Sequence, residues 1–139
     1  MSAEWDVNYV AVLVAAIAAM IIGAVYYLPA VAGKAWMNAI GKTEAEVRAA
    51  MTPRVLIAGF VLAILEMSVL AAIEGWAGAV GVADGVMVAL IVWLGLTLPA
   101  ASMNVLFEGR PTALHWVYGV NSLIIFAVAG AVIGWWRAM

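Results

Sequence analysis

The sequence contains no cysteine and only one histidine among its 139 residues. The missing cysteines exclude disulfides, thiolate metal sites and cysteine nucleophiles. A single histidine also excludes a metal site that draws several histidines from one chain. Charged residues make up 10% of the sequence, whereas a soluble domain carries about 25%. The net charge of −2 and the lack of a basic cluster argue against nucleic-acid binding.

Hydrophobic residues, by contrast, account for 68% of the sequence, and the mean hydropathy is +1.14. A soluble domain is about 45–50% apolar. A soluble domain of this size would leave a large share of that surface in water, because small domains bury only part of their surface. The sequence therefore predicts a protein whose surroundings are lipid. Its beginning, with Glu4 and Asp6, lacks the basic start of a secretory signal.

Four apolar stretches are long enough to cross a bilayer core, which takes about 20 helical residues. They run over about residues 7–28, 53–73, 85–107 and 112–136. After the first, a possible C-terminal cap at Gly41 and a capping box at Thr43 and Glu46 predict two short helices, which we expect in the headgroup layer. The predicted fold is an all-α integral membrane bundle of four transmembrane helices, in one domain over residues 1–139.

Small residues recur at four-residue spacing on two of the predicted spans, a pattern typical of close helix packing in lipid. The first span carries Ala11, Ala15, Ala19 and Gly23, and the last carries Gly130 and Gly134. We expect both faces to contact other helices.

Glu66 lies inside the second predicted span, roughly 20 Å from its start at about 1.5 Å per residue. An ionisable group at that depth costs several kcal/mol unless it faces protein, water or a partner. Two interpretations stay open. The carboxylate serves proton- or cation-linked chemistry, or it is a neutral group that hydrogen-bonds to a neighbouring helix.

The turn between the third and fourth spans, residues 103–115 (MNVLFEGRPTALH), brings a carboxylate, a guanidinium and an imidazole close together. The candidate polar cluster around this turn is Asn104, Glu108, Arg110, His115, Tyr118, Asn121 and Ser122. It forms either a cavity for a small ligand or lipid headgroup, or a hydrogen-bonded clamp, which we favour. In the clamp, Glu108 pairs with Arg110 or His115, and the two asparagines bridge the spans. Ser122 lies too deep relative to His115 for a catalytic triad, and we predict no catalytic or metal-binding residue.

The basic residues predict the orientation in the membrane. Lys34, Lys42, Arg48 and Arg54 precede or begin the second span, Arg110 follows the third, and only Arg137 lies on the other side. By the positive-inside rule, the connections with five basic residues are cytoplasmic. We therefore expect a multi-pass protein of the cell (inner) membrane with both termini outside the cytoplasm.

Two segments carry a family resemblance: YYLPAVAGKAWMNAIGKT over residues 26–43, and MNVLFEGRP over residues 103–111. They resemble the bacterial membrane family called "domain of unknown function 1761", and the resemblance covers essentially the whole chain. It implies an integral membrane protein with four spans. It implies no activity and transfers no site residue.

Three hypotheses for function remain. The first is a structural or accessory protein that acts through helix contacts, as a homo-oligomer or as a subunit of a larger membrane complex. The second is a homo-oligomeric transporter or channel for a small solute or ion that uses Glu66 and the Asn104–Asn121 region. The third is an enzyme similar in topology to the four-span glutathione-handling enzymes, although their second-span signature is not evident in residues 54–66. No cofactor is implied, and the bilayer is the first expected partner.

Overall fold

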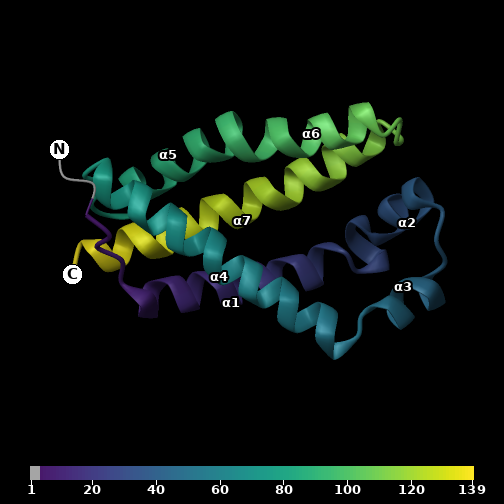
Figure 1. Ribbon diagram of the computed structural model, residues 1–139, viewed down its shortest axis with the longest axis horizontal. Coiled ribbons are helices and arrows are strands. Elements are labelled where there is room, and N and C mark those ends of the chain that lie inside the picture. Colours follow the sequence, from purple (N-terminus) through teal and green to yellow (C-terminus); the bar gives the residue numbers. More distant parts are fainter. Residues whose placement is uncertain (1–3) are drawn as a thin grey trace.

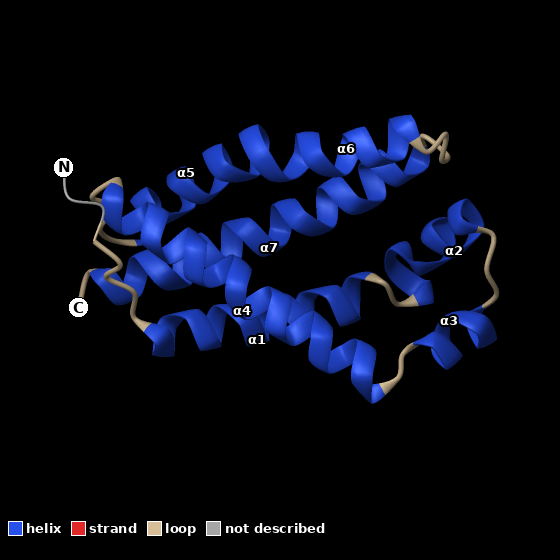
Figure 2. Ribbon diagram, viewed as in Figure 1, coloured by secondary structure: helices blue, strands red, loops and turns tan. Residues whose placement is uncertain are grey.

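The computed structural model describes residues 4–139, where helices joined by short loops and turns make up the fold, without a strand (Figure 1, Figure 2). The elements are α1 (Tyr9–Tyr26), the π-helical segment η1 (Pro29–Gly33), α2 (Lys34–Ile40), α3 (Glu44–Ala50), α4 (Pro53–Trp76), α5 (Val82–Val92), the π-helical segment η2 (Trp93–Thr97), α6 (Leu98–Phe107) and α7 (Ala113–Arg137). Four stretches are long and apolar enough to cross a membrane: α1, α4, the continuous stretch Val82–Phe107, and α7. The predicted all-α fold with four spans is confirmed.

Helix α7 is the centre of the bundle. It packs most extensively against α5 and α1, and α4 packs mainly against α1 (Figure 1). The beginning of α1 and the end of α7 lie at one end of the molecule, which we call the terminal end. Helices α2 and α3 and the turn between α6 and α7 lie at the opposite end, which we call the loop end.

The core consists mostly of small and aliphatic side chains from four helices, with α5 contributing Ala89. Helix α4 contributes Ala63, Met67 and Leu70, at the three- and four-residue spacing of one helical face. Helix α1 contributes alanines and Val12, and α7 contributes Phe126. The alanines allow the α1 backbone to lie close to its neighbours, as expected for helices that pack in lipid.

Glycines make the tightest helix contact, between α5 and α7. A Cβ atom at Gly85 would overlap the carbonyl group of Gly130, and one at Gly134 would overlap the carbonyl oxygen of Gly81. The amide of Gly81 also donates a hydrogen bond to the carbonyl oxygen of Gly134 across this contact, at 2.9 Å. The two helices therefore meet backbone to backbone, which residues with larger side chains would prevent.

The connection between α1 and α4 folds as its capping residues predict. Gly41 ends α2 in the left-handed conformation, with φ of 70°. The Thr43 hydroxyl accepts a hydrogen bond from the backbone amide of Glu46 at 3.2 Å, which caps the start of α3. Both predicted short helices are present.

The third span changes its helical form midway. Pro99 has no amide hydrogen, so it cannot donate to the carbonyl group four residues earlier. The chain adopts the π-helical segment η2 directly before the turn that holds this proline. Segments of this kind mark bends in helices and often occur at functional sites. The result is that α5 packs tightly on α7, whereas α6 packs on it more loosely.

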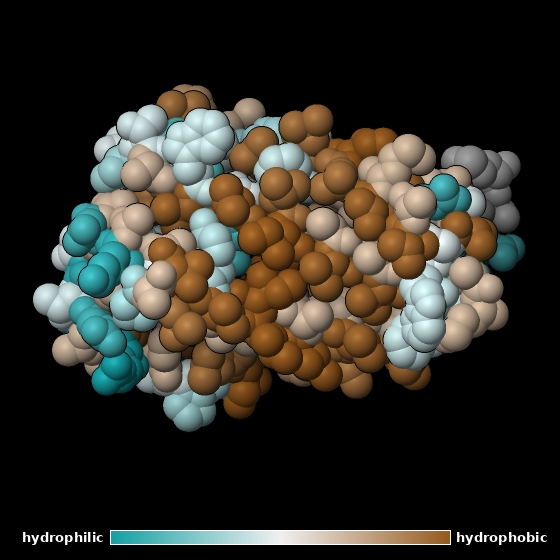
Figure 3. All heavy atoms as spheres, turned by 180° about the vertical axis from the view of Figure 1, so that it is seen from behind, coloured by the Kyte–Doolittle hydropathy of each residue, from teal (hydrophilic) through white to brown (hydrophobic). Residues whose placement is uncertain are grey.

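Figure 3 shows one face of the molecule with hydrophobic side chains over its middle. Hydrophilic side chains gather at the loop end, where α2 and α3 lie. This distribution matches a bundle whose middle faces hydrocarbon and whose ends face the polar layers.

Candidate functional site

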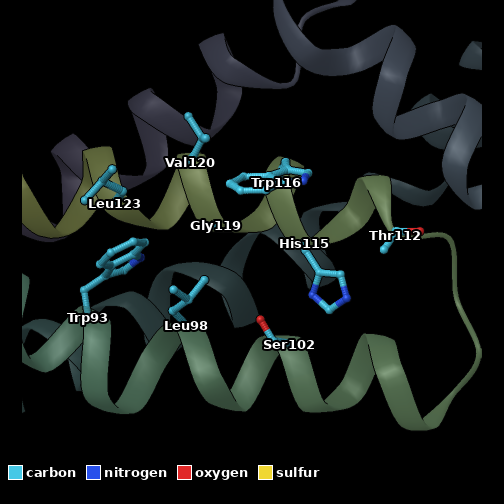
Figure 4. Close-up of a pocket in the computed structure, with 9 residues that line it drawn as sticks. All are labelled: Trp93, Leu98, Ser102, Thr112, His115, Trp116, Gly119, Val120 and Leu123. Carbon is cyan, nitrogen blue, oxygen red and sulfur yellow. The ribbon is translucent and has the colours of Figure 1, made fainter.

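A cleft of about 470 Å³ lies between the third span and α7. It begins beside η2, where Trp93 and Leu98 form its wall, and it continues toward the loop end (Figure 4). His115 of α7 and Ser102 of α6 project into the space between the two helices. The cleft exists because α6 packs less closely on α7 than α5 does.

The chemistry of this cleft is mainly that of an apolar binding surface. Its polar groups are the Ser102 and Thr112 hydroxyls and the His115 imidazole, and none of the residues that line it carries a carboxylate. No hydrogen bond joins His115 to Ser102 in the described part of the chain. A serine nucleophile activated by a histidine and a carboxylate is therefore not assembled here.

Arg110 organises the turn between α6 and α7. Its Nη1 lies 3.7 Å from a carboxylate oxygen of Glu108, and its Nη2 donates a hydrogen bond to the Tyr118 hydroxyl at 3.2 Å. The guanidinium also lies 5.7 Å from the centre of the Tyr118 ring, within the range of a cation–π contact. Gly109, with φ of 64°, provides the left-handed residue that reverses the chain between the two helices.

Ser122 of α7 connects the fourth span to the third. Its hydroxyl accepts a hydrogen bond from the indole nitrogen of Trp93 at 2.8 Å and donates to the carbonyl oxygen of Tyr118 at 2.9 Å. Trp93 was not among the predicted site residues. It begins the π-helical segment, whose position the sequence did not reveal.

The two asparagines of the predicted cluster do not meet. Asn104 is exposed, and the side-chain oxygen of Asn121 is buried without a hydrogen-bond partner within residues 4–139. Asn104 lies on an exposed face of α6, which packs less closely on α7 than α5 does. The structure thus brings together Glu108, Arg110 and Tyr118 on one side and Ser122 with Trp93 on the other, without an asparagine bridge.

Glu66 lies on the outer side of α4, away from the cleft. It is exposed, and its carboxylate makes no hydrogen bond or ion pair with any described residue. Its exposed neighbours on the same helix include Leu62, Leu65 and Val69. Within one chain, the structure therefore gives this carboxylate no neighbouring helix to bond to, and both interpretations of Glu66 stay open.

A second carboxyl group, that of Glu74, has the opposite environment. Glu74 is 0% exposed, and both of its carboxyl oxygens are buried without a hydrogen-bond partner in the part of the chain that the structure describes. The guanidinium of Arg137 lies beside the neighbouring Gly75, and its Nε donates to the carbonyl oxygen of Ala79 at 3.2 Å. Glu74 was not among the predicted site residues. Its spacing in the sequence could have identified it as buried, because Glu74 continues the buried stripe of Met67 and Leu70 on α4.

The small residues predicted to pack are placed as follows. Ala11, Ala15 and Ala19 are buried on α1, whereas no atom lies within 4 Å of a Cβ built on Gly23. Gly130 and Gly134 contact α5 within the same chain. Within residues 4–139, no group of three or more histidine, aspartate or glutamate side chains could hold a metal ion.

The helices and their apolar surfaces define a polytopic helical membrane protein. Comparison with family models identifies the family: residues 10–134 match the model described as "Protein of unknown function (DUF1761)", and the chain belongs to this family. No curated protein and no solved structure matches the chain.

Proposed function

We propose that this small membrane protein functions through contacts of its spanning helices with another membrane helix, either of a second copy or of a larger complex. The observation that carries the proposal is the exposed carboxyl group of Glu66, which has no partner among the described residues. The exposed apolar surface of α4 is not by itself evidence for a partner helix, because lipid is a favourable environment for apolar side chains.

The position of Glu66 along α4 supports this proposal. At about 1.5 Å per residue, it lies about 20 Å from Pro53 and about 15 Å from Trp76, well inside the span. An acidic side chain in the middle of a membrane helix costs about 2.5–3.5 kcal/mol on insertion scales. A polar group from a neighbouring helix would lower this cost by forming a hydrogen bond with the carboxyl group.

The packing around α4 leaves room for such a neighbour. Val55, Leu56 and Ile57 at the start of the helix are exposed, and so are Val61 and Leu62 in the next turns. Gly59 meets only the end of the Met20 side chain of α1, at 3.8 Å from a built Cβ. A second helix can therefore lie along this half of α4 without displacing the core.

The experiment is native mass spectrometry of the protein extracted gently from its own membrane, with Glu66→Gln and Glu66→Leu variants. We expect the unchanged protein to form a single oligomer or a complex of fixed ratio. Glu66→Gln retains hydrogen-bonding capacity and should preserve the assembly, whereas Glu66→Leu should lose it. Leu65→Ala, which changes the adjacent exposed position without removing a polar group, is the control.

Two results would contradict the proposal. One is an unchanged protein that is monomeric under these conditions, and the other is a Glu66→Leu variant that assembles as the unchanged protein does. An oligomer would identify the partner as a second copy, and other polypeptides in fixed ratio would identify an accessory subunit.

We further propose that the protein lies in the cell (inner) membrane with its loop end in the cytoplasm and both termini outside. Lys34, Lys42, Arg48 and Arg110 belong to the elements at the loop end, and Arg54 is in the first turn of α4. Only Arg137 belongs to the terminal end. This asymmetry supports the orientation through the positive-inside rule.

A further inference from the structure

A second cavity, of about 460 Å³, lies at the loop end between α2 and the turn that joins α6 to α7. Its walls include Trp36, Ile40, Lys42, Arg110, Pro111 and Tyr118. Two segments far apart in the sequence thus contribute one basic residue each to the same space. The family and the proposed helix association assign no role to this cavity.

We propose that this cavity binds a phosphate group, carried by a phospholipid at the membrane surface or by a soluble phosphate compound. The proposal does not depend on the helix association proposed above. It stands on the placement of the two cations, on the absence of a carboxylate from the lining, and on the position of the site at the loop end.

Arg110 is held in place for such a contact. The hydrogen bond from its Nη2 to the Tyr118 hydroxyl and the ring beneath it fix the plane of the guanidinium. A planar guanidinium can donate two parallel hydrogen bonds to phosphate oxygens, and a fixed one loses less conformational entropy when it does so. Arg110 is also only partly exposed, so a bound anion would be less screened there than at an open surface.

Lys42 supplies the second charge from the other wall of the cavity. It follows Gly41, the left-handed residue that ends α2, so the chain turns at this point and brings the lysine to the cavity. No ion pair within residues 4–139 involves Lys42. Its ammonium group is therefore available to an anion from outside the chain.

The acidic group nearest to Arg110 lies outside the cavity. None of the residues that line the cavity is acidic, and the carboxylate of Glu108 is more than half exposed, with a long contact of 3.7 Å to Arg110. An exposed ion pair of this kind contributes little, because water and salt screen it. A phosphate that contacts both Arg110 and Lys42 would interact more strongly than Glu108 does with one of them.

The remaining walls suit the boundary between headgroups and hydrocarbon. Trp36 packs on Tyr27 with ring centres 4.8 Å apart, which holds the indole at the side of the cavity. Aromatic side chains concentrate at this level of membrane proteins, and basic pockets between membrane helices bind anionic headgroups. A phospholipid could place its phosphate between the two cations while its chains remain in the bilayer.

The test measures phosphate binding by the full-length protein in two settings. In the first, native mass spectrometry measures which lipid stays bound to the protein from nanodiscs of phosphatidylcholine with and without phosphatidylglycerol. In the second, inorganic phosphate is titrated onto the protein in phosphatidylcholine nanodiscs, with chloride at equal ionic strength as the reference. The measurements use salt of about 0.3 M. This concentration shortens the screening length and so suppresses non-specific attraction of anions to the basic surface.

The variant is Lys42→Gln with Arg110→Gln, and the matched control is Lys34→Gln with Arg54→Gln. The control removes the same charge from exposed residues near the same end, outside this cavity. We expect the cavity variant to lower phosphate affinity at least about tenfold, since it removes the charge-assisted hydrogen bonds of both cations. The control should change it much less. Lys42→Gln alone alters an exposed side chain and should show part of the loss in a fully folded protein.

Preferential retention of phosphatidylglycerol, lost in the cavity variant, would identify a lipid site. Saturable binding of inorganic phosphate, lost in the same variant, would identify a site for a soluble phosphate compound. Equal losses in the cavity variant and the control would overturn the proposal, and so would a failure of both probes to bind.

Discussion

At the scale of single residues, the carboxyl group of Glu74 combines full burial with a lack of hydrogen bonds in the described chain. A buried polar group without a partner costs about 1–3 kcal/mol. Replacing such a group with an apolar one of similar shape removes this cost.

The first prediction is that Glu74→Met stabilises the protein by about 1–3 kcal/mol, because methionine fills a similar volume without buried oxygens. Thermal unfolding in detergent, followed by circular dichroism, measures the change as a higher Tm. Ala49→Met, which introduces the same residue at an exposed position of α3, is the control and should alter stability by less than about 0.5 kcal/mol. A lower Tm for Glu74→Met would mean that the carboxyl group has a partner such as water linked to Arg137.

The two glutamates of α4 show what a sequence can and cannot predict at this scale. Their depth in the membrane follows from their position along the apolar stretch, so the depth of Glu66 could be predicted from the sequence. Whether a carboxyl group faces the core or the outside depends on which side of α4 meets α1 and α7. The buried stripe that ends at Glu74 was visible in the spacing of Met67 and Leu70, but the predicted span stopped at residue 73.

At the scale of elements, the π-helical segment before Pro99 lies at one end of the cleft, where Trp93 and Leu98 line it. Alanine at position 99 would restore an amide hydrogen that can donate to the carbonyl group of Gly95. We predict that Pro99→Ala straightens the third span and narrows the space between α6 and α7. A cysteine introduced at Ser102, which lines the cleft, should then react several-fold more slowly with a small thiol reagent in detergent solution.

Phe107→Cys, at the exposed end of α6, serves as the control for this second prediction. Its rate should be the same with proline or alanine at position 99, because it lies outside the cleft. An unchanged rate at position 102 would show that the bend is set by packing rather than by the proline.

Element boundaries were the most predictable part of this fold. Pro29, Gly41, Thr43 and Pro53 act locally on the backbone, so their effects can be read without knowing the tertiary structure. The π-helical segment η2 was not predicted, because it depends on how Trp93 and Leu98 pack against α7. Likewise, the Gly130–Gly134 pattern predicts a close contact but does not identify α5 as its partner.

At the scale of the whole molecule, the distribution of charge makes the orientation testable. The chain has no cysteine, so single introduced cysteines report on one position each. Asp6→Cys places a thiol at the terminal end, and Ala45→Cys places one on α3 at the loop end. We predict that a membrane-impermeant maleimide labels position 6 in intact cells and position 45 only after permeabilisation. The reverse pattern would contradict the proposed orientation.

The central position of α7 has a consequence for how the protein forms. Helix α7 supplies the surface against which α1 and α5 bury their small residues, and it is the last of the four spans to be synthesised. Helices α1 and α5 are synthesised before the α7 surface that they pack against exists. Helices α1 and α4 can pack on each other first, but the complete bundle forms only when α7 has been made, so its assembly is a late event of biogenesis.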